Sequence, residues 1–357
     1  MHLTEVKAMI SKFMINKFQT SKSGVLSLRL LTFAALLLTC VGLFVSAASA
    51  ELCSTVTDMD AATRSALEHA ALQFGDAVVR GDAASLRQNA IASLASNFAG
   101  AEALVNESKP VLAGAQASVR ATYLLDATGG PPVLEHAEFL CGIWGTPQFV
   151  SFTLNSLPSG KYGLVIEDVK SSKGPYLLSF ILQQEGAAWK LAGFPPPKPG
   201  QVLGHDAPWY LTKAREFKAK GQTHNAWFYY QEARALVTPV NFISFTPLIK
   251  LDKEAQQSMP ADLPTNGPVN LTAANGKTYK ITEIFPVVVE NGMDLVVKYS
   301  LPDVSNTAQT FQENSNVIKT IATKYPEYRE TFAGIVARAV APNGQDYGTL
   351  LNMKDIQ

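Results

Sequence analysis

Residues 161–185 of this 357-residue chain read KYGLVIEDVKSSKGPYLLSFILQQE, and this stretch decides the fold of the first half. Apolar side chains recur at every second position from Tyr176 to Leu182, which is typical of a strand with one buried face. Lys173-Gly174-Pro175 interrupts the alternation with residues that favour turns. The stretch therefore predicts two antiparallel strands, at about 161–170 and 176–185.

Further runs with a period of two lie on both sides of this hairpin, and Gly- and Pro-rich breaks separate them. We expect these strands at about 117–126, 133–144, 148–155 and 188–194. Because short connections join antiparallel neighbours, all six strands are predicted to form one antiparallel meander. Helical spacing before residue 110, with a break at Gly81-Asp82, predicts the helices that cover its apolar face. The fold class expected is α+β.

Two segments resemble a known fold family. FGDAVVRGDAASL (74–86) and the closing strand AAWKLAGF (187–194) are similar to the ketosteroid-isomerase-like cone fold, also called nuclear transport factor two-like or cystatin-like. The resemblance covers about residues 60–195 and implies helices on a curved sheet whose mouth holds a small apolar ligand. In the isomerases of that family, a carboxylate base works with a tyrosine and a protonated acid.

The resemblance makes five residues candidates for catalysis: Tyr123, His136, Glu138, Tyr162 and Asp168. Strand alternation does not place all five on one inner face. The alternative is that His136 and Glu138 share a face exposed to solvent, while Tyr123 and Tyr162 pack in the sheet.

Residues 1–50 are typical of an export signal peptide. Basic residues lead into an uncharged run, and the small residues Ala48-Ser49-Ala50 match the pattern that a signal peptidase cleaves. Cleavage there predicts a periplasmic or extracellular, secreted protein. The alternative is a membrane anchor at residues 30–50, because about 20 apolar residues span a bilayer.

The chain without its leader keeps Cys53 and Cys141. An oxidising compartment favours a disulfide between them. Two buried free thiols are the alternative.

Residues 195–200 read PPPKPG, and proline of this density forms a stiff spacer. We therefore predict a linker at 196–200, between a cone-like domain at 51–195 and a helical hairpin at 201–260. Residues from Tyr210 to Ala233 have the spacing of one tetratricopeptide-like unit. Because such repeats need about three copies for stability, the hairpin is expected to pack on a neighbouring domain. Its aromatic residues are candidates for partner binding: Trp209, Tyr210, Trp227 and Tyr230.

Residues 261–357 contain three Asn-Gly pairs, at 275–276, 291–292 and 343–344, each between extended runs. Asn-Gly between alternating runs indicates a β-hairpin. With one helix at about 305–324, this segment is predicted to form a second α+β domain, a small antiparallel sheet with a single helix. It resembles no family that we recognise.

Composition excludes several functions. The net charge is zero, and −4 without residues 1–50, whereas nucleic-acid-binding proteins carry a basic surplus. No metal or other cofactor is expected, because the histidines are not at ligand spacings and no phosphate-binding glycine loop occurs.

The leading hypothesis is an exported, non-enzymatic protein that binds a small apolar ligand in the cone or a protein partner through the hairpin. The alternatives are a small-molecule isomerase or lyase and a structural envelope protein.

Overall fold

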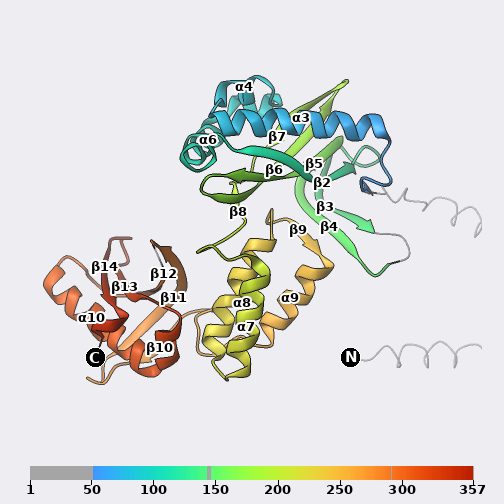
Figure 1. The fold of residues 1–357 in the computed structure, drawn as a ribbon. Coiled ribbons are helices and arrows are strands. Elements are labelled where there is room, and N and C mark those ends of the chain that lie inside the picture. The colour runs from blue at the N-terminus through green and yellow to red at the C-terminus, as the bar shows by residue number, and fades with distance from the viewer. Residues whose placement is uncertain (1–50, 143–145, 291, 357) are drawn as a thin grey trace, which may run out of the picture. The chain divides into compact units, whose positions relative to one another are not determined.

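The computed structural model describes residues 51–142, 146–290 and 292–356. The predicted signal peptide, the alternative anchor at 30–50 and Asn291 of one predicted turn lie outside these residues. The described part of the chain is α+β, which confirms the predicted fold class (Figure 1).

The first sheet has the strand order β1-β2-β5-β6-β7, with β8 paired to β6, and all its pairs are antiparallel. Its strands are β1 (Leu52–Ser54), β2 (Gln116–Asp126), β5 (Lys161–Ser171), β6 (Gly174–Glu185), β7 (Ala188–Gly193) and β8 (Lys198–Pro199). β5 and β6 are the hairpin predicted from residues 161–185. Gly174 lies in its turn with φ of 116°, a conformation that favours glycine.

One face of the first sheet is covered by α3 (Ala61–Arg80) (Figure 1). The helix begins where the Asp60 side chain accepts a hydrogen bond from the Thr63 amide at 2.8 Å, and it ends at Gly81 with φ of 71°. Apolar residues of α3, including Leu67 and Phe74, pack in one cluster with apolar residues of β5 and β6. Three shorter helices follow: α4 (Ala83–Gln88), α5 (Ala92–Ser96) and α6 (Ala99–Leu112).

The expected six-stranded meander is wrong. β3 (Val133–Gly142) and β4 (Phe149–Pro158) leave the first sheet and form a second one with β9 (Ile243–Phe245), in the order β3-β4-β9. Apolar residues of β3 and β4 pack in one cluster with Val240 and Ile243, from much later in the chain. Turn chemistry predicts that β3 pairs with β4, but it does not determine which sheet the pair joins.

A disulfide joins Cys53 of β1 to Cys141 of β3, with their Cα atoms 5.1 Å apart. This confirms the predicted pairing and excludes the alternative of two free thiols. Since β1 belongs to the first sheet and β3 to the second, the bond links the two sheets covalently.

The proline-rich linker lies along the first sheet. Lys198 and Pro199, as β8, pair with Leu177 and Tyr176 of β6. The Gly200 amide then donates a hydrogen bond of 2.8 Å to the Pro175 carbonyl. These linker residues are therefore hydrogen-bonded to β6, a strand of the first sheet.

The helical hairpin consists of α7 (Ala207–Ala219) and α8 (Thr223–Val237), and α9 (Thr246–Gln256) packs beside α8 (Figure 1). Buried alanines, including Ala214 and Ala226, let α7 and α8 approach closely. The turn between them contains Gly221, whose φ of 79° favours glycine.

The third sheet has the order β10-β11-β12-β13-β14. Its strands are β10 (Val269–Thr272), β11 (Thr278–Val289), β12 (Gly292–Ser300), β13 (Gly334–Val340) and β14 (Asp346–Asn352). It differs from the expected antiparallel sheet at one pair, because β12 and β13 are parallel. The helix α10 (Thr307–Lys324) connects the two strands and returns the chain to the end of the sheet at which β12 begins, as a parallel connection requires.

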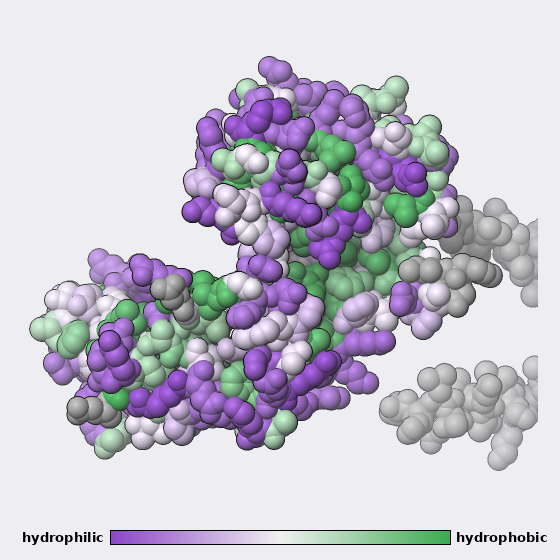
Figure 2. Space-filling model, in the orientation of Figure 1, coloured by the Kyte–Doolittle hydropathy of each residue, from purple (hydrophilic) through white to green (hydrophobic). Residues whose placement is uncertain are grey.

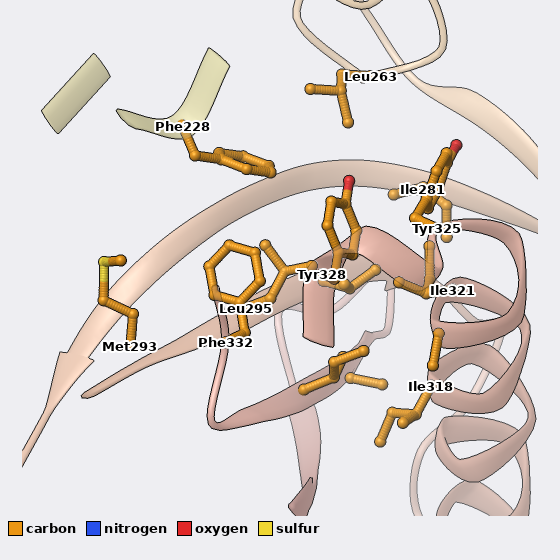
Figure 3. Close-up of a cluster of buried hydrophobic side chains, with 14 of the residues drawn as sticks. Phe228, Leu263, Ile281, Met293, Leu295, Ile318, Ile321, Tyr325, Tyr328 and Phe332 are labelled. Carbon is orange, nitrogen blue, oxygen red and sulfur yellow. The ribbon is translucent and has the colours of Figure 1, made fainter. Parts of the chain in front are cut away.

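The hairpin and the third sheet share one hydrophobic cluster, as expected for a single helical unit (Figure 3). Phe228 of α8 lies 6.0 Å from Tyr328 and 5.7 Å from Phe332, measured between ring centroids. Polar contacts support this packing, because the Asp262 carboxylate accepts hydrogen bonds from His224 of α8 at 2.8 Å and from Tyr325 at 2.7 Å. Burial alone would raise the pKa of Asp262, but these hydrogen bonds, together with Lys324, whose Nζ lies 3.3 Å from the carboxylate, outweigh it and lower the pKa to about 2.

Candidate ligand-binding cleft

A cleft of about 380 Å³ lies on the face of the first sheet opposite α3. Ile166 of β5 and Leu177 of β6 line it, whereas their neighbours Val165 and Leu178 pack toward α3. Successive side chains of a strand point to opposite faces, so the cleft and the α3 cluster are separated by the sheet itself. We call it the Tyr123 cleft, after the tyrosine in its wall.

The lining of the Tyr123 cleft is mainly apolar. Besides Ile166 and Leu177, it includes Val150 of β4, Leu236 of α8, and Ile243 and Phe245 of β9. Hydrophobic surface is visible in this region, where β4 and β9 adjoin the first sheet (Figure 2). Ligand pockets in proteins are typically apolar and have volumes of about 300–1,000 Å³. Size and lining therefore both suit a small apolar molecule.

Three larger hollows in the described residues differ in character. One, of about 730 Å³, lies beside Trp227 and is lined mostly by charged and amide side chains of α8 and α9. Another, of about 470 Å³, lies between β10 and α10 and is lined mostly by Thr, Asn and Lys. A third, of about 430 Å³, lies beside α3 and α4 and is lined mostly by polar and charged side chains. None of the three is lined mainly by aliphatic and aromatic side chains, as the Tyr123 cleft is.

A β-bulge in β2 shapes one wall of the Tyr123 cleft. Val119 pairs with Glu167 and Ala121 pairs with the adjacent Ile166, so Arg120 is an extra residue without a partner in the ladder. Because of this bulge, Val119 packs toward α3, whereas Arg120 and Ala121 both line the cleft. Bulges commonly redirect a side chain in this way beside a functional site.

Arg120 carries the positive charge of the cleft wall. Its Nη1 donates a hydrogen bond of 3.3 Å to Oδ1 of Asp168 on β5. Both side chains are about half exposed, at 56% and 48%, so this ion pair contributes little to stability. It does, however, neutralise the guanidinium locally.

Tyr123 is half-buried, and its ring packs edge-on against Phe152 at 4.9 Å between centroids. Burial raises the pKa of the phenol, so the hydroxyl keeps its proton at neutral pH. Within the described residues, the hydroxyl has no hydrogen-bond partner, yet it is not sealed from solvent. It is therefore a free donor in an apolar wall.

The other candidates for catalysis lie elsewhere. His136 and Glu138 are exposed on β3, where His136 Nδ1 lies 3.0 Å from Asn155 Oδ1. Tyr162 is buried in the core formed by the first two sheets, and its hydroxyl donates to the Pro158 carbonyl at 2.8 Å. Of the five candidates, only Tyr123 lines the cleft, and Asp168 is linked to it through its hydrogen bond with Arg120.

The four hairpin candidates divide into two kinds. Tyr210 and Tyr230 are buried, and their hydroxyls donate to the Val202 carbonyl at 3.0 Å and to Glu254 Oε1 at 2.8 Å. Trp209 and Trp227 keep exposed surface, although Trp209 stacks on His205 at 3.7 Å between centroids. Only the two tryptophans therefore present surface that a partner can contact.

Glu167 is a residue that the sequence analysis missed. It is 0% exposed on the α3 face of β5, and neither carboxylate oxygen has a hydrogen-bond partner among the described residues. Burial, with a smaller contribution from Asp76, raises its pKa to about 8. Gly75 of α3 lies directly against the carboxylate, because a Cβ there would overlap Glu167 Oε2. This carboxyl is packed into the core, on the opposite side of the sheet from the Tyr123 cleft.

The described residues contain neither a metal-binding cluster nor a helix suited to crossing a membrane. No group of three or more His, Cys, Asp and Glu side chains there is arranged to hold a metal ion. No helix in the same residues combines the length and the apolar character needed to cross a membrane. Comparison with protein-family models, with curated proteins and with solved structures finds no match for this chain.

Proposed function

We propose that this protein is exported and non-enzymatic, and that it binds a small apolar ligand in the Tyr123 cleft. The observation that supports this function best is the apolar lining of a 380 Å³ cleft by residues of β5, β6, α8 and β9. A ligand there would bury its surface against side chains from three parts of the chain. The proposed role is therefore transport, storage or sensing of that ligand.

The proposal of export rests on two features. The leader at residues 1–50 has the charge and hydropathy pattern of a signal peptide, and the Cys53–Cys141 disulfide suits an oxidising compartment. We also propose that the first module is a ketosteroid-isomerase-like cone, which α3 on an antiparallel sheet supports.

The isomerase or lyase alternative is less well supported. A general base must reach the proton that it removes from a bound substrate. The carboxyl with the strongly raised pKa, Glu167, lies on the α3 side of the sheet, where Gly75 packs against it. It cannot contact a ligand in the Tyr123 cleft without rearrangement of the sheet.

Titration with N-phenyl-1-naphthylamine, an uncharged apolar fluorophore, tests the binding function. Val237 lines the cleft and is partly exposed, so Val237→Trp should fill the cleft without disrupting the core. Val288→Trp is the matched control, because Val288 is an exposed valine on β11. We expect one probe per chain, and binding at least tenfold weaker in Val237→Trp than in wild type or Val288→Trp. No binding by wild type, or equal binding by all three proteins, would contradict the proposed function.

A further inference from the structure

The Tyr123 cleft contains two hydrogen-bond donors that the protein itself does not use fully. The Tyr123 hydroxyl has no partner among the described residues. The Arg120 guanidinium uses Nη1 for Asp168, and its other N–H groups donate to no other described residue. A guanidinium offers five N–H donors, so most of its capacity is available.

The position of these donors is specific to the fold of β2. Tyr123 reaches the cleft by ordinary strand alternation, in step with Ala121. Arg120 and Tyr123 are three positions apart and would lie on opposite faces of a regular strand, but the bulge at Arg120 places both on the cleft side. Two donors therefore lie within four residues of one strand, in a wall that is otherwise apolar.

The charge of the site decides which acceptor fits. Asp168 already neutralises Arg120, so the cleft wall has no net charge to attract an anion. A carboxylate ligand would also lie close to the Asp168 carboxylate, and like charges at short range repel. An uncharged oxygen acceptor meets neither obstacle.

We propose that the Tyr123 cleft binds an uncharged apolar molecule that carries an acceptor oxygen, with the Tyr123 hydroxyl and the Arg120 guanidinium as its donors. This inference rests on the proposed function and adds the chemical class of the ligand. The apolar body of the ligand lies against Ile166, Leu177 and Phe245, and its oxygen lies toward β2.

Three probes of similar size test the ligand class: methyl 2-naphthoate, 2-naphthoate and 2-propylnaphthalene. They differ in carrying a neutral ester, a carboxylate or no oxygen. A net hydrogen bond contributes about 0.5–1.5 kcal/mol, which corresponds to a two- to tenfold change in Kd. We expect wild type to bind the ester about two- to tenfold more tightly than the hydrocarbon, and more tightly than the carboxylate.

Tyr123→Phe should remove most of the preference for the ester and leave hydrocarbon binding unchanged. Because the hydroxyl has no partner in the protein, this variant should unfold at the same temperature as wild type. Tyr162→Phe is the matched control: its hydroxyl donates to Pro158 and it does not line the cleft, so it should keep the preference.

The outcomes separate the two proposals. If the hydrocarbon binds as tightly as the ester, or if Tyr123→Phe keeps the preference, the inference about the acceptor oxygen is wrong while the binding function stands. A preference for 2-naphthoate would assign an anionic ligand instead. If no probe binds wild type, both the inference and the proposed function are wrong.

Discussion

Replacement of Glu167 by glutamine should change how the stability of the protein depends on pH. The carboxyl is 0% exposed, and its pKa is raised from 4.5 to about 8. Because the folded state binds this proton more tightly than the unfolded state does, the neutral carboxyl favours folding. The full contribution is present below about pH 4.5, and it is lost progressively as the pH rises to about 8.

The magnitude follows from the size of the pKa shift. At about 1.36 kcal/mol per pH unit, the shift corresponds to a loss of about 5 kcal/mol in the free energy of unfolding between these pH values. This is a large share of the roughly 5–15 kcal/mol that stabilises a typical protein. Glutamine has nearly the same shape and no charge, so Glu167→Gln should lack this loss.

Urea unfolding at pH 5, 6, 7 and 8, followed by circular dichroism, measures the effect. The free energy of unfolding of wild type should fall relative to that of Glu167→Gln by about 1 kcal/mol for each pH unit between pH 5 and pH 8. Groups other than Glu167 titrate equally in both proteins and do not contribute to this difference. Glu135→Gln, at an exposed position on β3, is the control and should follow wild type at every pH. If wild type and Glu167→Gln give parallel curves, Glu167 is not the buried, unpartnered carboxyl described here.

Two further predictions concern the disulfide and the leader. The double variant Cys53→Ser, Cys141→Ser opens a loop with a sequence separation of 88. Loss of the bond should lower the free energy of unfolding, measured by urea titration, by about 4–5 kcal/mol. A change below 1 kcal/mol would show that the bond does not constrain the unfolded chain. Mass spectrometry of the protein isolated from the producing cell should find Glu51 at its N-terminus, and an intact leader would contradict cleavage after Ala50.

Local sequence patterns were sufficient for the longer strands and for α3, but not for the short strands β1, β8 and β9 or for α9. The hairpin at 161–185 was predictable because alternation and the Gly174-Pro175 turn both concern neighbouring residues. The end of α3 was predictable for the same reason, since Gly81 adopts the left-handed conformation that closes a helix.

Long-range pairing was not predictable from local patterns. β4 pairs with β9, about 90 residues later in the chain, and no turn signal indicates such a partner. The parallel pairing of β12 with β13 likewise depends on how α10 crosses the third sheet. Spacing alone gives the longer strands but not the order in which they lie side by side.

The candidate site was predictable only in part. Tyr123 and Asp168 were among the candidates, whereas Arg120 was not, because a single-residue bulge cannot be recognised in the sequence of β2. Glu167 did leave a signal: it lies between Val165 and Val169 at positions that alternate toward α3, and a charged residue on a buried face is unusual.

A crystal structure of the protein grown with methyl 2-naphthoate would show directly whether the Tyr123 cleft binds an apolar ligand that carries an acceptor oxygen. We expect the naphthalene ring to lie between Ile166 and Phe245 in the Tyr123 cleft, with the ester oxygen within hydrogen-bond distance of the Tyr123 hydroxyl. A probe bound instead in the hollow beside Trp227, or a cleft closed by side chains in the crystal, would contradict this expectation.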